Sequence, residues 1–523
     1  MPVINACERE IMEEEQNIVL KRYAAQCIMP KIETDLFFND KDYKEKILQL
    51  VRTGVSGFCV FGGDISKCKE MTSELQQKAE IPLIFSADFE HGLPMRLSDG
   101  TSFPHALSFG RTGSPDITFD VAKAIAIESL QAGINMNLAP VCDIFSNKDN
   151  PIINIRSFGE TPEEIIPHII SYINGTQSEN LIDCAKHFPG HGDTDVDSHN
   201  TLPIVKHSLE RFRKFELMPF TAAIKAGVKS IMIGHLAVPE LEPSGIPSSQ
   251  SYEIITGLLR NELKYTGLII TDALDMSPIS NEQSSGLAAF LSIKAGANIA
   301  LMPTSPEEAI NYLYESALSD NNFSKILEKS FQIIINTKKQ TGLYNKRDKI
   351  GSPTTVFAEH EKLALLAAYK SIKIIGDSTL VPVSEEKRIA GFALILNEDI
   401  NPGIKFFKYL AEAIENDADF GFIDDTISDS DILSLKEQIN DTNLLIIALF
   451  LRTKTDKLNP EYIKRLKYII NTLAKGKQTI TIQFGNPYML KDLNVTTTLA
   501  TYSDSLAGIA ATIYILCGRN AFQ

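Results

Sequence analysis

The chain has 523 residues, of which 44% are hydrophobic and 22% charged, and its formal net charge is −15. This length predicts two or three domains, since one hydrophobic core rarely grows beyond about 300 residues. The acidic balance argues against nucleic acid or an anionic membrane as the main partner.

Neither a membrane span nor a secretion signal is expected. The sequence has no run of about 20 apolar residues. Residues 1–15 are rich in glutamate and lack a basic start followed by an apolar stretch. The seven cysteines are scattered and never spaced as CxxC, which favours reduced thiols over disulfides or a zinc site. We therefore expect a cytoplasmic protein.

Short apolar runs alternate with helical patterns between residues 24 and 341. The apolar runs lack polar alternation, which is typical of strands buried on both faces. They cover residues 25–29, 55–61, 83–87, 134–138, 181–185, 230–234, 267–271 and 298–302. The helical patterns cover residues 43–52, 66–78, 117–132, 162–178, 209–226, 252–263, 282–295, 306–318 and 323–338.

This alternation predicts an N-terminal (β/α)8 TIM-like barrel over residues 1–341. A doubly wound parallel sheet is the alternative. The barrel is favoured because polar residues follow several of the strands, among them Asp88, Lys186, His235 and Asp272. A barrel brings the carboxyl ends of all its strands to one mouth.

A second domain is expected after a linker. Residues 342–355 contain KRDK and GSP and are predicted to connect the domains. Residues 356–523 again alternate strands and helices, which predicts a parallel α/β sheet with helices on both sides. The sequence GNPY at 485–488 follows one of these strands and predicts a turn, where a ligand contact is left open.

The sequence KHFPGHGDTDVDSH at 186–199 places one lysine, three histidines and three aspartates within fourteen residues. Residues two apart in an extended segment point to the same side, so the Asp197 carboxylate can bond the His199 imidazole. Such a pair makes a histidine a usable general acid and base near neutral pH. An exposed histidine beside a turn is the structural alternative. Metal binding is a weaker one, because the HExxH and HxH spacings are absent.

Other charged residues lie where the barrel mouth is predicted. Asp272 directly follows four apolar residues and suits either a nucleophile or a helix N-cap. Asp88 and Arg96 flank a tight segment, and Arg156 lies in a second loop. Such residues suit hydroxyl-rich or anionic ligands, and they equally suit ion pairs that hold loops closed.

In combination these motifs resemble the family 3 glycoside hydrolases, in particular their β-N-acetylhexosaminidase (β-N-acetylglucosaminidase) branch. The resemblance rests on KHFPGHGDTDVDSH at 186–199, TDALDM at 271–276, NPIINIRSFG at 150–159, and Asp88 followed eight residues later by Arg96. It implies the barrel for residues 1–341 and an appended α/β sandwich for residues 356–523. It also implies hydrolysis with retention of anomeric configuration, without a cofactor or a metal.

The resemblance further implies a role for each matching residue. Asp272 corresponds to the nucleophile, His199 to the acid/base and Asp197 to its dyad partner. The positions that bind the terminal N-acetylglucosamine correspond to Asp88, Arg96, Arg156, Lys186 and His187. The sequence DFEHG at 88–92 departs from the usual form of the branch, nearer DQEGG, so this loop is expected to shape the aglycone side differently.

We therefore predict an exo-acting β-N-acetylglucosaminidase that acts through a glycosyl-enzyme intermediate. A carbohydrate partner, such as a muropeptide-like peptidoglycan fragment, is expected, because a neutral imidazole repels anionic groups less than a carboxylate would. Two alternatives are a phosphorolytic enzyme that releases the sugar 1-phosphate and a catalytically idle sugar-binding protein. The intact Asp272, Asp197 and His199 argue against the idle protein.

Overall fold

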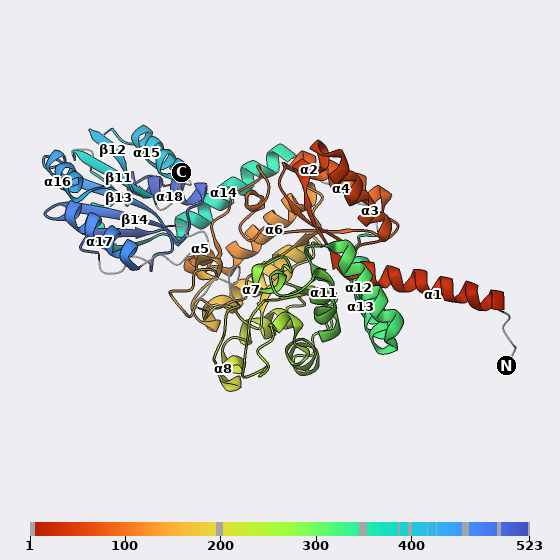
Figure 1. Ribbon diagram of the computed structural model, residues 1–523. Coiled ribbons are helices and arrows are strands. Elements are labelled where there is room, and N and C mark those ends of the chain that lie inside the picture. Colours follow the sequence, from red (N-terminus) through yellow and green to blue (C-terminus); the bar gives the residue numbers. More distant parts are fainter. Residues whose placement is uncertain are drawn as a thin grey trace.

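The computed structural model describes residues 6–194, 202–344, 353–384, 387–395, 400–415, 417–424, 426–451, 460–488 and 493–520. In its N-terminal part, short strands lie among helices (Figure 1). The strands are β1 (Ile28–Met29), β2 (Lys31–Glu33), β3 (Gly57–Phe61), β4 (Ile84–Ala87), β5 (Met136–Asn137), β6 (Cys184–Phe188), β7 (Ser230–Ile233), β8 (Leu268–Thr271) and β9 (Ala300–Leu301). The structure confirms a mixed α/β fold.

These strands pair in parallel in three sheets, with the orders β1-β9, β2-β3-β4-β5 and β6-β7-β8. Isolated parallel bridges join neighbouring sheets, Met136 with Ile182 and Ile270 with Ile299. Only Pro30 separates β1 from β2 in the chain. Closure of these sheets into one eight-stranded barrel stays a prediction.

Helices follow most of these strands, as the periodicity predicts. They are α1 (Ala6–Gln26), α2 (Thr34–Asn39), α3 (Lys41–Thr53), α4 (Ile65–Lys78), α5 (Ala106–Thr112), α6 (Pro115–Gln131), α7 (Pro162–Ser178), α8 (Leu209–Lys214), α9 (Met218–Lys225), a π-helical segment (Glu253–Glu262), α10 (Ser277–Ser280), α11 (Ser285–Ala295), α12 (Pro306–Ser319) and α13 (Asn321–Gln340). In α7 the side chain of Thr161 accepts the backbone N–H of Glu164, and Pro162 begins the helix. This start has the expected cap chemistry.

Two predicted elements differ in the structure. The single helix predicted over 209–226 is divided into α8 and α9, because Pro219 has no N–H to donate to the preceding turn. The strand predicted at 181–185 lies at Cys184–Phe188, so Lys186 and His187 are inside the strand rather than after it. Polar residues are tolerated there because each is paired with a carboxylate.

The helix α14 (Pro353–Ser371) begins inside the predicted linker and lies between the two parts of the molecule (Figure 1). Its residues Ala364 and Ala367 belong to the hydrophobic core of the N-terminal part. At the other end of the helix, Ser371 is buried and leads directly into the C-terminal sheet.

The C-terminal sheet has the order β10-β15-β14-β13-β11-β12. Its strands are β10 (Lys373–Gly376), β11 (Ile389–Ile395), β12 (Ala418–Ile423), β13 (Leu444–Leu451), β14 (Gln478–Gly485) and β15 (Thr497–Ala500). The helices of this part are α15 (Asn401–Ala413), α16 (Asp429–Gln438), α17 (Pro460–Ala474) and α18 (Leu506–Leu516). Two separate hydrophobic clusters surround the sheet, as expected for helices on both faces.

The prediction of an entirely parallel C-terminal sheet is wrong at one edge. β10 pairs antiparallel with β15, while the other pairs in this sheet are parallel. An edge strand forms a ladder with one neighbour only, and the residues of β10 are exposed, so burial on both faces does not constrain its direction. Within the described ranges, no helix is long and apolar enough to cross a lipid bilayer.

Candidate active site

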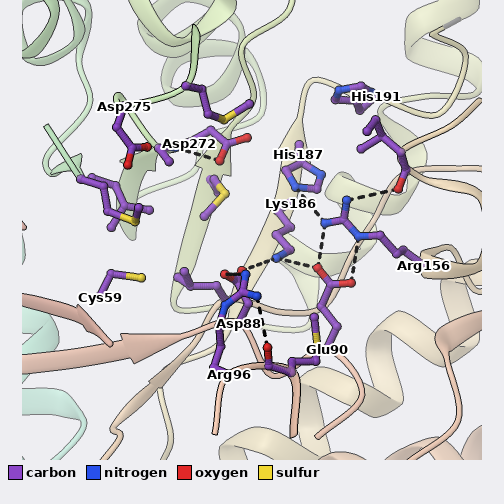
Figure 2. Close-up of a pocket in the computed structure, with 18 of the residues that line it drawn as sticks. Cys59, Asp88, Glu90, Arg96, Arg156, Lys186, His187, His191, Asp272 and Asp275 are labelled. Atoms are coloured by element: carbon purple, nitrogen blue, oxygen red, sulfur yellow. Dashed lines mark hydrogen bonds and ion pairs between the residues drawn. The ribbon is translucent and has the colours of Figure 1, made fainter. Parts of the chain in front are cut away.

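A cavity of about 360 Å³ lies at the carboxyl ends of several N-terminal strands (Figure 2). Asp88 and Glu90 follow β4, Lys186 and His187 lie near the end of β6, and Asp272 directly follows β8. Apolar and sulfur-containing side chains complete much of the wall, namely Cys59, Phe61, Leu138, Met232, Met276 and Met302. The cavity therefore combines a charged side with an apolar one.

Lys186 is the centre of the charged side. Its Nζ lies 2.8 Å from Asp88 Oδ1 and 2.8 Å from Glu90 Oε1, and only 2% of its side chain is exposed. Burial by itself would lower the pKa of Lys186, but the two carboxylates outweigh this effect and raise its pKa above the usual value. The carboxylates thus keep a buried ammonium charged.

Two arginines contact the same carboxylates. Arg96 Nη2 lies 2.6 Å from Asp88 Oδ2. Arg156 holds Glu90 through two bonds, with Nη2–Oε1 at 2.7 Å and Nε–Oε2 at 3.0 Å (Figure 2). Burial would raise the pKa of both acids. The surrounding cations instead lower the pKa of Asp88 to about 2 and that of Glu90 well below its usual range, so both acids are ionised at neutral pH.

His187 is oriented by a buried carboxylate that does not line the cavity. Asp143 Oδ2 lies 2.7 Å from Nδ1 of His187, and Asp143 Oδ1 accepts the backbone N–H of His191 at 2.6 Å. The side chain of Asp143 is fully buried. A carboxylate on Nδ1 fixes the ring and presents Nε2 towards the cavity, where Arg156 Nη2 lies 3.5 Å away.

Asp272 is held by backbone contacts at the end of β8. Its N–H donates to the carbonyl of Ile233 on β7 at 2.8 Å, and its Oδ1 accepts the N–H of Ala273 at 2.8 Å. Burial would raise the pKa of Asp272, but His187, His235 and the Ala273 amide together lower it below its usual value. The carboxylate is therefore ionised. Unlike Asp88 and Glu90, it has no ion-pair partner among the described residues.

The structure brings six of the eight predicted site residues to one cavity, namely Asp88, Arg96, Arg156, Lys186, His187 and Asp272. Asp88, Arg96 and Arg156 each form an ion pair within the cavity, as the alternative interpretation predicts. Their role in ligand binding stays a prediction. The other two, Asp197 and His199, lie outside the described residues. Their role as a dyad stays a prediction.

Two residues of this network, Glu90 and Asp143, are absent from the sequence predictions. Glu90 lies two residues after Asp88, and the same-side argument that paired Asp197 with His199 applies to it as well. Asp143 follows the fourth predicted strand, where a polar residue near a strand end is a signal for the barrel mouth. Their pairing with Lys186 and His187 is visible only in the fold.

Three of the residues that raised the metal alternative, His187, His191 and Asp193, lie within the described ranges and have other partners. His187 and the N–H of His191 bind Asp143, and Asp193 pairs with His207. In the part of the chain that the structure describes, no three His, Cys, Asp or Glu side chains are arranged to hold a metal ion. What the described donors do offer is charged hydrogen bonding to a hydroxyl-rich ligand next to an ionised carboxylate.

Comparison with known proteins agrees with this chemistry. Residues 24–335 match the N-terminal domain model of glycosyl hydrolase family 3. The chain belongs to this family. Beta-hexosaminidase A of Pseudoalteromonas piscicida is 39% identical over 256 residues, which cover 46% of this chain and 43% of that relative. A beta-N-acetylglucosaminidase/beta-glucosidase of Cellulomonas fimi is 25% identical over 479 residues, or 86% of this chain and 84% of the relative.

The similarity extends to solved structures and covers both parts of the family 3 chain. A glycoside hydrolase family 3 beta-N-acetylglucosaminidase from Paenibacillus sp. str. FPU-7 superposes with a TM-score of 0.82 at 26% identity. The superposition covers 96% of this chain and 97% of that one. The predicted family and the enzyme class, a glycoside hydrolase, are confirmed.

The charged network predicts a pH-dependent loss of stability in Glu90→Gln. The substitution leaves the buried Lys186 and the half-buried Arg156 with one carboxylate fewer, which is expected to lower the free energy of unfolding by about 3–5 kcal/mol at neutral pH. Because folding lowers the pKa of Glu90, its contribution is complete above the unfolded value of 4.5 and is lost as the pH falls. The difference in the free energy of urea unfolding between the variant and the wild type should therefore begin to shrink as the pH falls below 4.5, and it should vanish only well below that value, where folded Glu90 is protonated as well.

Asp275→Asn is the matched control, since Asp275 lines the same cavity but burial and Asp272 raise its pKa. The free energy of unfolding of this variant should lie within about 1 kcal/mol of the wild-type value. An equal decrease in the free energy of unfolding of both variants at neutral pH would show that the Lys186 network does not depend on Glu90.

Proposed function

We propose that the chain is a retaining exo-β-N-acetylglucosaminidase that removes terminal N-acetylglucosamine through a glycosyl-enzyme intermediate on Asp272. The observation that carries the proposal is the half-buried, ionised Asp272 carboxylate in the same cavity as the Lys186 network. The names of the relatives support the choice of sugar, since they include a beta-hexosaminidase and two beta-N-acetylglucosaminidases.

The first step is a nucleophilic displacement. One oxygen of Asp272 forms a bond to the anomeric carbon, the bond to the aglycone oxygen breaks, and that oxygen takes a proton from the acid/base. Because the Oδ1 atom of Asp272 already accepts the Ala273 N–H, the carboxylate is fixed at the strand end with its other oxygen available. A low pKa keeps this nucleophile ionised at neutral pH.

The charged side of the cavity is proposed to hold the sugar. Asp88, Arg96, Arg156, Lys186 and His187 would bond its hydroxyl and acetamido groups. Charged donors and acceptors that are already paired and ordered lose little conformational entropy when a sugar hydroxyl joins them. This arrangement suits an exo-acting enzyme, because a cavity of about 360 Å³ lies at the small end of the range for ligand sites and would hold one terminal sugar.

We propose His199 as the acid/base and Asp197 as its partner, both outside the described residues. The described segment that leads to them is held beside the cavity. The Asn150 side chain donates to the carbonyl of His191 at 2.9 Å, and Asn147 donates to that of Thr194 at 3.2 Å. In the second step the same histidine would deprotonate a water that attacks the anomeric carbon and releases Asp272.

The surrounding architecture and the substrate complete the proposal. We infer that strands β1 to β9 form one (β/α)8 barrel, since parallel pairs and bridges lead from strand to strand and β9 pairs with β1.

An imidazole acid/base adds no negative charge to the site, which favours substrates that carry carboxylates, such as peptidoglycan fragments. The described cysteines are free and mostly buried, which fits the reducing cytoplasm.

Asp272→Asn tests the nucleophile. The amide cannot form the glycosyl ester, so kcat for a 4-nitrophenyl N-acetyl-β-glucosaminide should fall by about 10³-fold or more. Asp275→Asn removes a carboxyl from the same cavity and should change kcat by less than about 10-fold. Wild-type turnover by the Asp272 variant would rule out the proposed mechanism.

His199→Ala tests the acid/base through the leaving group. A 2,4-dinitrophenyl leaving group needs little protonation and a phenyl group needs much more, so kcat/KM should fall further for the phenyl glycoside. An equal fall in kcat/KM for both substrates would contradict the assignment.

Analysis of the products with and without phosphate separates hydrolysis from phosphorolysis. Free N-acetylglucosamine in both cases is expected, whereas sugar 1-phosphate would establish the phosphorolytic alternative.

A further inference from the structure

The loop of residues 141–160, between β5 and α7, connects the cavity with the C-terminal sheet. It carries Arg156 and Ile152, which line the cavity, and Asp143, which orients His187. The two ends of the loop are joined to each other. Ser157 Oγ donates to the Asp143 carbonyl at 2.6 Å, and Phe145 N–H donates to the Gly159 carbonyl at 3.0 Å.

The C-terminal sheet packs against this loop next to Arg156. Ile155, whose side chain is buried, forms a small hydrophobic cluster with Leu107, Ala500 and Tyr502. Ala500 ends β15, so the contact joins the loop to the sheet itself. The helix α5 contacts the same region, since Ser108 Oγ donates to the carbonyl of Thr501 at 3.3 Å.

A polar cluster at the end of the loop adds directional contacts. The Tyr488 hydroxyl donates to the Glu160 carboxylate and lies 2.9 Å from Arg111 Nη2. Arg111 Nη2 also pairs with Glu160 at 2.5 Å. Lys148, from the same loop, pairs with Glu160 and places its Nζ 4.1 Å from the centre of the Tyr488 ring. Burial opposes the charge on Glu160, but these bonds keep its pKa below the usual value.

Tyr488 is itself held in place by the turn after β14. The side chain of Asn486 accepts the Tyr488 N–H at 2.9 Å, and Asn486 is buried. Gly485 ends the strand with a φ of 91°, a left-handed conformation that favours glycine. The GNPY sequence thus builds a rigid turn that directs a phenol at the loop and not into the cavity.

We propose that Tyr488 is a positioning residue for sugar binding, acting through Glu160 and the 141–160 loop on Arg156. This inference rests on the proposed function, in which Arg156 binds the sugar. The C-terminal part of the chain would then influence sugar binding indirectly, through the position of Arg156. Arg156 needs such support, because its guanidinium meets Glu90 through two directional bonds and a shift of the loop would misalign both.

Tyr488→Phe tests the proposal, since it keeps the ring and its packing and removes only the hydroxyl. KM for an aryl N-acetyl-β-glucosaminide should rise by about three- to tenfold, while kcat changes by less than about twofold. Backbone amides of residues 150–159 should exchange hydrogen faster. Tyr409→Phe is the matched control, because Tyr409 is an exposed tyrosine on α15 and should leave KM and exchange unchanged.

A double-mutant cycle separates positioning from a general loss of stability. In an Arg156→Lys background, Tyr488→Phe should change KM by less than about twofold, because the group it positions has been replaced. The inference would be overturned if Tyr488→Phe raised KM by the same factor in both backgrounds. It would also be overturned if Tyr488→Phe alone changed neither KM nor the hydrogen exchange of residues 150–159.

The two proposals fail in different ways. A wild-type enzyme that turns over no aryl N-acetylglucosaminide would contradict the proposed function. Hydrogen exchange would then decide the inference on its own, since faster exchange at 150–159 in Tyr488→Phe supports the contact with the loop and unchanged exchange refutes it.

Discussion

The site depends on the burial of one ammonium group. Lys186 lies inside a strand with 2% of its side chain exposed, and a charge in that position is stable only when it is paired. Asp88 and Glu90 provide the pairs, and Arg96 and Arg156 in turn contact these acids. Each charge in the network is therefore stabilised by an opposite charge beside it.

This network influences the nucleophile as well. Three cations face the two carboxylates of Asp88 and Glu90, so one positive charge remains uncompensated. Lys186 is among the groups that lower the pKa of Asp272, after His187, His235 and the Ala273 amide. The side of the cavity proposed to hold the sugar thus also favours the ionised form of the residue proposed to attack it.

The constraint extends beyond the cavity. Arg156 lies on the 141–160 loop, which also supplies Asp143 to orient His187. The same loop contacts the C-terminal sheet through Ile155, Glu160 and Tyr488. An appended domain that gives no described side chain to the cavity wall is in this way connected to the side chains that do line it.

Local signals in the sequence predict much of this arrangement. Apolar runs that lack polar alternation locate the strands to within a few residues, and charged residues near their ends locate the cavity. The exact end of β6 is not predictable in this way, because Lys186 and His187 continue the strand only when Asp88, Glu90 and Asp143 pair with them. These partners lie about 40 to 100 residues earlier in the chain.

The remaining differences have two origins. Pro219 is a local signal in the sequence that divides a helix whose apolar spacing is otherwise continuous. The antiparallel direction of β10, in contrast, depends on its position at the sheet edge. Tyr488 lies in a turn that the sequence predicts, but its contact with Glu160 joins residues 328 positions apart. Contacts over such distances depend on the packing of the whole chain, which periodicity and spacing do not encode.

Trapping the glycosyl-enzyme tests the central claim most directly. The wild-type enzyme is incubated with 2-acetamido-2-deoxy-5-fluoro-β-glucopyranosyl fluoride, whose adduct hydrolyses slowly, and the labelled peptide is sequenced by mass spectrometry. The account predicts one sugar attached to Asp272 and no adduct in Asp272→Asn. An adduct on another residue, or turnover of an aryl glycoside with inverted configuration and no adduct, would contradict it.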